Sequence, residues 1–252
     1  MAKFVKYLSQ DGVERFGLIN KDLNFIEIEG DVFTSYKITD KIIPSDKVKI
    51  LPPIIPSKIV AVGLNYKDHA MELGMKLPDE PVIFIKTPNT VIGQMDKIIY
   101  PEMSNQVEYE AELAIIIKNT IRNIDEDLVD ANILGYTCLN DVTARDLQKK
   151  DVQWTRAKCF DTFAPIGPYF TKDINPDKVN IKLYLNGELK QNSNTSNFIF
   201  KTKKIVNFIS KICTLNRGDI ITTGTPSGTG PMNKGDKVEI EIENVGKLTN
   251  FV

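Results

Sequence analysis

Short segments in which hydrophobic and polar residues alternate recur along the chain, and this spacing predicts β-strands more often than helices. Within the first 51 residues the segments KFVKYL, ERFGLI, NFIEIE and VKILPP are each expected to form a short strand, with SQDG as a turn. We therefore expect a small N-terminal β domain over residues 1–52, which ends at Pro52-Pro53, and a larger domain over residues 53–252.

The larger domain is expected to open with a strand and a helix. Residues Lys58–Leu64 form an apolar run typical of a buried strand, and Asn65–Leu73 follow with helical spacing up to Gly74, a common helix stop. The next residues, up to Pro81, are polar and contain prolines, so residues 65–81 are expected to form a mobile lid. The segment PVIFIK then predicts another strand.

The remainder is again rich in predicted strands. We expect a long strand over Val107–Lys118, a short helix over Asp125–Leu134, a strand over Gly135–Asn140 and a short helix over Ala144–Lys150. We also expect a hairpin at the Asn-Gly of VNIKLYLNGEL, an amphipathic helix over Thr202–Ile212, a strand at GDIITTGTP and two closing strands in KVEIEIENVGKLTNFV. Because strands outnumber helices and do not alternate strictly with them, the pattern favours an α+β barrel or rolled sandwich.

Composition and net charge argue against several classes of protein. The net charge is -1 and both signs are interspersed, so nothing predicts binding to nucleic acid or to an anionic membrane. No apolar stretch has the length of a signal peptide core or a membrane span, which favours a cytoplasmic location. The three cysteines are widely spaced and are expected to be free thiols, and the single histidine argues against a His-rich zinc site.

Three carboxylates are candidate metal ligands. Glu110 and Glu112 lie two apart in VEYEAELAIII, so on a strand they share one face, and Asp141 follows the next predicted strand. Carboxylate oxygens without histidine or thiol partners favour Mg²⁺, Mn²⁺ or Ca²⁺ over zinc. The alternative is an exposed acidic face with Asp141 capping a turn. Glu108 is expected to lie outside the ligand set.

Two further groups are candidates for catalysis. His69 and Glu72 share a helix face, so the carboxylate can orient the ring as a general base. The alternative is an exposed pair that only stabilises the helix. Lys158 lies in RAKCFDTFAPIG, an unusually apolar surrounding, where it can hold substrate charge or simply extend its amine to water.

A loop rich in hydroxyls and glycines follows the predicted strand GDIITTGTP. Residues Thr223–Pro226, with Gly228 and Gly230, suit an anionic substrate or form a plain turn. The loop lacks the GK[ST] ending of a phosphate-binding loop, so no nucleotide cofactor is predicted.

Taken together, these segments resemble the fumarylacetoacetate hydrolase family, in its acylpyruvate hydrolase and 2-hydroxyhepta-2,4-diene-1,7-dioate isomerase-like branch. The resemblance covers essentially residues 58–252 and lies in VGLNYKDHAMELG, PVIFIKTPNT, VEYEAELAIII, GYTCLNDVTARDLQ, WTRAKCFDTFAPIGP, YLNGELKQNSNTSNFIF and GDIITTGTPSGTG. It implies a mixed β-roll or distorted β-barrel behind a small N-terminal β domain, and a homodimer.

The resemblance also implies roles for particular residues. The metal-binding carboxylates fall on Glu110, Glu112 and Asp141, and the catalytic groups on His69, Glu72 and Lys158. Substrate contacts fall on Arg145, Gln148 and Thr225, of which Arg145 is expected to be structural as often as substrate-binding.

The implied activity is Mg²⁺-dependent hydrolysis of a C–C bond in small 2,4-dioxo acids, with Mn²⁺ as an alternative metal. Tautomerisation or decarboxylation of oxaloacetate, or isomerisation or hydration of a 2-oxo-dienoate, would use the same site. A catalytically silent protein that binds a ligand or a stabilising cation is a third possibility.

Overall fold

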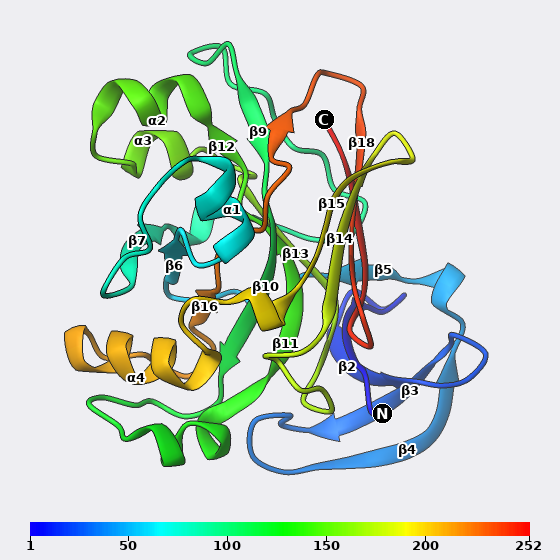
Figure 1. The fold of residues 1–252 in the computed structure, drawn as a ribbon. Coiled ribbons are helices and arrows are strands. Elements are labelled where there is room, and N and C mark those ends of the chain that lie inside the picture. The colour runs from blue at the N-terminus through cyan, green and yellow to red at the C-terminus, as the bar shows by residue number, and fades with distance from the viewer.

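The structure is a computed structural model that describes residues 1–252, and it has the α+β composition that the sequence predicts. Strands dominate, and the four α-helices lie on one side of the molecule in the view of Figure 1. None of the helices combines the length and the apolar character that crossing a membrane requires.

One large sheet forms the centre of the molecule. Its strands are β1 (Phe4–Leu8), β2 (Glu14–Ile19), β3 (Phe25–Gly30), β4 (Tyr36–Ile43), β5 (Lys49–Leu51), β6 (Ile59–Gly63), β7 (Val82–Lys86), β8 (Val91–Ile92), β10 (Ala111–Ile117), β11 (Ile133–Asn140), β13 (Ala164–Thr171) and β16 (Ile220–Thr222). The main path runs β4-β3-β2-β1-β13-β11-β10-β16-β6-β7, with β5 beside β1 and β8 beside β13. The path is open, with β4 and β7 at its ends, so this sheet does not close into a barrel.

Two smaller sheets complete the strands. A four-stranded sheet has the order β15-β14-β18-β19 and consists of β14 (Asn180–Leu185), β15 (Glu188–Asn194), β18 (Lys237–Ile242) and β19 (Gly246–Phe251). A three-stranded sheet has the order β12-β9-β17 and consists of β9 (Val107–Tyr109), β12 (Thr143–Ala144) and β17 (Gly230–Pro231). The main core joins buried residues of the large and four-stranded sheets, such as Leu113, Ile181 and Ile240, so these two sheets share one apolar interior.

The helices are α1 (Lys67–Glu72), α2 (Arg145–Asp151), α3 (Thr155–Lys158) and α4 (Thr202–Ile212). The bounds of α4 are those predicted, and it buries Ile205, Val206 and Ile209, the face that its spacing predicts. The predicted hairpin is also confirmed. Asn186 and Gly187 connect β14 to β15 with φ angles of 52° and 85°, as the two-residue turn between twisted strands requires.

Two predicted elements are wrong, and one strand of the structure was not predicted. Val107–Lys118 is not one strand: it breaks at Glu110 into β9 and β10, which belong to different sheets. The break follows from contacts with a distant part of the chain, because the Glu110 N–H donates to Asn140 Oδ1 at 2.9 Å and its carbonyl accepts from the Asp141 N–H at 2.9 Å. These bonds turn the chain away from a regular ladder.

The predicted helix over Asp125–Leu134 consists of two short 3₁₀ turns, Glu126–Leu128 and Asp130–Asn132, and its last two residues begin β11. Pairing of β11 with both β10 and β13 overrides the local helical preference. Strand β4 was not predicted. It lies at one edge of the sheet and leaves Ile38 and Ile42 each 57% exposed. Because neither face of β4 is buried, its sequence does not alternate clearly between apolar and polar residues.

Candidate active site

A cavity of about 300 Å³ opens between the lid segment, β6, β10 and the helices α2 and α3. Eight of the nine predicted site residues line it, and the ninth, Glu72, contacts one of them. The lining predicted residues are His69, Glu110, Glu112, Asp141, Arg145, Gln148, Lys158 and Thr225. The structure thus brings the separated motifs together at one place.

The three candidate metal ligands converge. Glu110, Glu112 and Asp141 are buried, and each offers a carboxylate oxygen within 4.8 Å of the others. The antiparallel register pairs Ala111 of β10 with Asn140 of β11, so the next residues outward, Glu110 and Asp141, also lie opposite each other. The ligands meet because of this register and the break at Glu110, and not because a single strand presents both glutamates.

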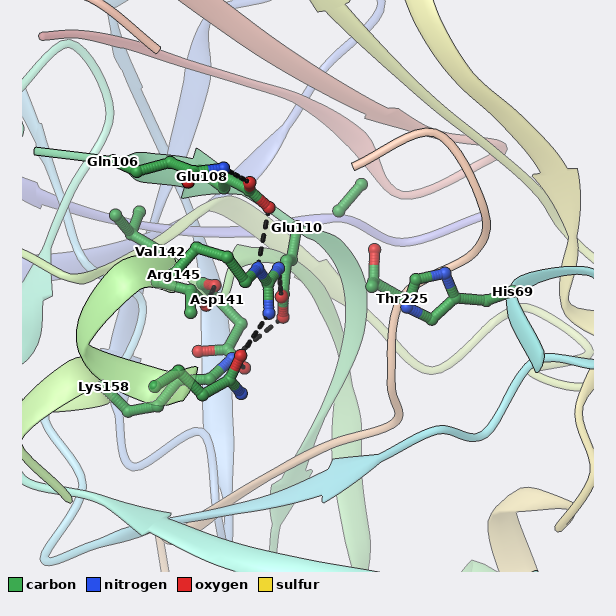
Figure 2. Close-up of polar contacts among 12 residues, drawn as sticks. His69, Gln106, Glu108, Glu110, Asp141, Val142, Arg145, Lys158 and Thr225 are labelled. Carbon is green, nitrogen blue, oxygen red and sulfur yellow. Dashed lines mark hydrogen bonds and ion pairs between the residues drawn. The ribbon is translucent and has the colours of Figure 1, made fainter. Parts of the chain in front are cut away.

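Two buried lysines hold these carboxylates. Lys158 Nζ donates to Glu110 Oε2 at 2.9 Å and to Asp141 Oδ2 at 2.6 Å, as Figure 2 shows. Lys86, at the end of β7, donates to Asp141 Oδ1 at 2.6 Å and to the Val142 carbonyl at 3.1 Å. Lys86 was missed in the sequence, although a lysine inside the apolar run PVIFIK is the same signal that singled out Lys158.

Arg145 forms ion pairs with both Glu108 and Glu110. Its Nε donates to Glu108 Oε2 at 2.8 Å and its Nη2 donates to Glu110 Oε1 (Figure 2). Its Nη1 donates to Gln148 Oε1. Glu108 also accepts from Gln106 Nε2 at 2.6 Å, so this carboxylate is satisfied by side chains outside the triad. Arg145 therefore holds Glu110 and Gln148 in place.

Glu112 is the exception, because no cation contacts it. Its Oε2 accepts the Gly224 N–H at 2.8 Å. Burial, together with the charges of Asp141 and Glu110, raises the pKa of Glu112 well above its usual range. Burial also acts on Glu110, but the nearby charges of Lys158 and Arg145 outweigh it and lower the pKa of that carboxyl.

The donor set fits a divalent cation. The cluster contains four carboxylates (Glu108, Glu110, Glu112 and Asp141) and three cations (Lys86, Arg145 and Lys158), so with all four carboxylates ionised it carries one excess negative charge. An oxygen-only set with an uncompensated carboxylate suits a hard ion such as Mg²⁺ or Mn²⁺. A bound cation would also remove the repulsion that disfavours ionised Glu112.

The histidine–glutamate pair lies on helix α1, within residues 65–81, the segment predicted to form a lid. His69 Nδ1 is 2.9 Å from Glu72 Oε2, and the Glu72 carboxylate also accepts the Gly228 N–H at 3.1 Å. Position 228 requires glycine, since its φ is +90° and a Cβ would lie 2.3 Å from the Lys190 carbonyl oxygen. The glycine-rich loop thereby fixes Glu72, and Glu72 fixes the His69 ring across the cavity from Lys158 (Figure 2).

Two amides that the sequence analysis missed position the surrounding loops. Asn65 Nδ2 donates to the Thr223 carbonyl at 2.8 Å, which ties the start of the lid to the loop before Thr225. Gln191 Nε2 donates to Thr225 Oγ1 at 2.9 Å, and Gln191 Oε1 accepts the Ala111 N–H at 2.9 Å. Their signal was present, because both lie within the segments that carry the family resemblance.

Comparison with known proteins identifies the family. Residues 58–252 match the family described as fumarylacetoacetate (FAA) hydrolase C-terminal, and residues 2–53 match the family described as Rv2993c-like, N-terminal. Protein Rv2993c of Mycobacterium tuberculosis is 44% identical over 229 residues, which are 90% of this chain and 86% of that protein.

Two further relatives have names that describe an activity. The mitochondrial oxaloacetate tautomerase fahd2 of Xenopus laevis is 42% identical over 224 residues, 84% of this chain and 70% of that protein. The crystal structure of 2-hydroxyhepta-2,4-diene-1,7-dioate isomerase from Mycobacterium marinum is 39% identical, with a TM-score of 0.93 over 100% of this chain and 98% of that chain. The match over most of the chain, in sequence and in fold, shows that this protein belongs to the fumarylacetoacetate hydrolase family of enzymes.

Proposed function

We propose that the protein is a divalent-metal-dependent hydrolase that cleaves the bond between C3 and C4 of small 2,4-dioxo acids of the acylpyruvate type. The observation that carries the proposal is the oriented His69–Glu72 pair facing a buried carboxylate triad. The His69–Glu72 pair supplies a base that can take a proton from water, and the carboxylate triad supplies a place for a cation near the substrate.

Glu110, Glu112 and Asp141 would hold the metal ion, Mg²⁺ or Mn²⁺. Such an ion supplies positive charge where the 2-oxo and carboxylate oxygens of the substrate bind and where the enolate develops. Lys158 supports the same charge, because an ammonium has three N–H donors and only two are used by Glu110 and Asp141.

His69 would act as the general base. With Nδ1 hydrogen-bonded to Glu72, the ring carries its proton on Nδ1 and leaves Nε2 to accept a proton from water. The water oxygen adds to C4, the C3–C4 bond breaks, and its electron pair passes into the enolate of pyruvate. The proton held by His69 is returned to C3, so water and the 2,4-dioxo acid become pyruvate and a carboxylic acid.

Arg145, Gln148 and Thr225 are the proposed substrate contacts. Arg145 acts mainly on Gln148 and Glu110, to which it donates hydrogen bonds. Gln148 keeps its amide N–H₂ for a substrate oxygen, since its Oε1 is the atom that accepts from Arg145.

A second candidate is keto–enol tautomerisation of oxaloacetate, favoured by relatives that are named oxaloacetate tautomerases. Decarboxylation of oxaloacetate, or isomerisation or hydration of a 2-oxo-dienoate, belongs to the same group, and one structural neighbour is named as such an isomerase. All of these reactions pass through a stabilised enolate, so the carboxylates and Lys158 support them equally. The His69–Glu72 pair is the feature that favours use of water.

A substrate panel tests the proposal. Pyruvate release from acetylpyruvate that requires added Mg²⁺ or Mn²⁺ and stops in EDTA is the expected result. A change in enol absorbance with oxaloacetate, or CO₂ release, without acetylpyruvate cleavage would favour the second candidate. Metal-dependent melting without turnover of any 2-oxo acid would mean a silent binding protein.

We also propose that the enzyme is cytoplasmic, as its widely spaced cysteines suggest, and, from the family resemblance, that it is a homodimer. Light scattering on the purified protein would give about twice the 28.4 kDa chain mass for a dimer. A single-chain mass at micromolar concentration would contradict it.

A further inference from the structure

The lining of the cavity combines two kinds of side chain. It contains the carboxylates with Lys158 and Arg145, and also a group of apolar side chains that the proposed mechanism does not use. This apolar wall consists of Leu64, Leu73, Met75, Phe84 and Trp154.

The apolar wall is not covered by the rest of the protein. Leu73 and Met75, on the lid, are 53% and 55% exposed, and Leu64, Phe84 and Trp154 are half-buried. Apolar side chains that gather around a cavity and remain open offer area that a ligand can bury.

The wall begins next to the reacting groups. The rings of Phe84 and Trp154 meet nearly at right angles with centroids 5.2 Å apart. Lys158 Nζ lies 4.8 Å from the Phe84 ring centroid, so Phe84 neighbours both Lys158 and Trp154. A substrate bound near Lys158 and longer than a 2-oxo acid head group would extend along these rings.

The charges of the site also limit the substrate. Of the three cations that line the cavity, Arg145 and Lys158 are paired with buried carboxylates, and Lys149 is exposed on α2. The cluster has one excess negative charge, so a bound divalent cation would change it to one excess positive charge. One substrate carboxylate balances that charge, whereas a second would lie against the apolar wall without a buried partner.

We infer that this site selects 2-oxo acids with a single carboxylate and an apolar distal group, alkyl or aryl, which packs on Leu73, Met75, Phe84 and Trp154. The inference rests on the proposed function only in placing the 2-oxo acid head at the carboxylate cluster. It predicts that acylpyruvates with an apolar tail are better substrates than dicarboxylates such as oxaloacetate.

Trp154 is the single tryptophan of the chain, so its fluorescence reports on the apolar wall without any turnover. The protein with Mg²⁺ would be titrated with 2-oxo acids that lack a 4-oxo group: 2-oxobutanoate, 2-oxohexanoate, 2-oxooctanoate and 2-oxoadipate. Affinity is expected to rise roughly fourfold per methylene, from about 0.8 kcal/mol for each buried CH₂. 2-Oxohexanoate should bind more tightly than 2-oxoadipate, which has the same length and a second carboxylate.

Matched variants localise the effect. Leu73→Ala and Met75→Ala should weaken binding of 2-oxooctanoate and leave 2-oxobutanoate unchanged. Met71→Ala is the control, because Met71 lies on the same lid segment, is 76% exposed and does not line the cavity. Lys149→Ala should leave the ratio between 2-oxohexanoate and 2-oxoadipate as it is.

The inference is overturned if 2-oxoadipate binds as tightly as 2-oxohexanoate, or if affinity does not depend on chain length. Its failure is distinct from that of the proposed function. Acylpyruvate hydrolysis without the chain-length trend refutes the apolar subsite alone. The trend without hydrolysis refutes the hydrolase alone.

Discussion

Replacing Lys86 with methionine should destabilise the protein strongly, although Lys86 does not line the cavity. Its side chain is fully buried, and its ammonium lies 2.6 Å from Asp141 Oδ1 and 3.1 Å from the Val142 carbonyl oxygen. Methionine has a similar volume, so the substitution removes the charge and two hydrogen bonds with little change in packing.

The expected loss of stability depends on the contacts that Asp141 keeps after Lys86 is replaced. Removing one partner of a buried ion pair typically costs about 3–5 kcal/mol, because the other charge stays buried without compensation. Asp141 keeps Lys158 at 2.6 Å, so we expect the lower end, about 3 kcal/mol. At about 2–4 °C per kcal/mol for a chain of this size, Tm should fall by roughly 6–12 °C.

The assay is thermal unfolding in EDTA, followed by circular dichroism, so that bound metal does not contribute to stability. Lys49→Met is the matched control, because Lys49 is 57% exposed and pairs with Asp96 at 2.9 Å. An exposed pair is worth about 0–1 kcal/mol, so this control should melt close to the wild type. If Lys86→Met also melts within about 2 °C of the wild type, a shift too small for a lost buried pair, the assignment of Lys86 as a structural counter-ion is wrong.

The remaining predictions concern the site and the thiols. Glu112→Gln should weaken Mg²⁺ binding in calorimetry, since it removes the carboxylate without a counter-ion; unchanged affinity would exclude Glu112 as a ligand. His69→Ala should slow acylpyruvate hydrolysis by roughly 10²- to 10⁴-fold with metal affinity unchanged, and a normal rate would remove it as the base. Burial raises the pKa of the Cys138 thiol to about 12, so it stays protonated at pH 8, and a thiol reagent should modify only the half-buried Cys159 and Cys213 before unfolding. Rapid reaction of all three thiols in the folded protein would contradict this.

Local patterns predicted those elements whose own residues decide their structure. Helix α4 depends on the helical spacing of its apolar residues, and the turn at Asn186-Gly187 depends on residues that accept positive φ angles. The apolar spacing and the Asn-Gly pair can both be read in the sequence. The break at Glu110 was not visible, because it depends on hydrogen bonds to Asn140 and Asp141, about thirty residues later. Strand β4 has no buried face that would give it a clear pattern.

In the site, too, some features could be predicted from local sequence and others depend on distant contacts. Residue type and family resemblance identified the carboxylates, His69 and Lys158, but could not say which charge would lack a partner. That Glu112 is unpaired follows from the positions of Lys86 and Arg145, which only the folded chain brings to the other carboxylates. The roles of these residues in catalysis stay predictions until the variants are measured.

The joining of β1 to β13 has a consequence for engineering this enzyme. Phe4 stacks on Phe170 of β13 with centroids 4.9 Å apart, and the two residues pair across the antiparallel strands. A fragment that began after Pro53 would present this edge uncovered, with its aromatic ring and its unpaired peptide groups, to any second molecule in solution. In the whole chain the outermost strand is instead β4, where Lys37, Asp40 and Lys41 are exposed. The first fifty residues thus cover the β13 edge and leave as the border a strand that carries three charged side chains beside the exposed Ile38 and Ile42.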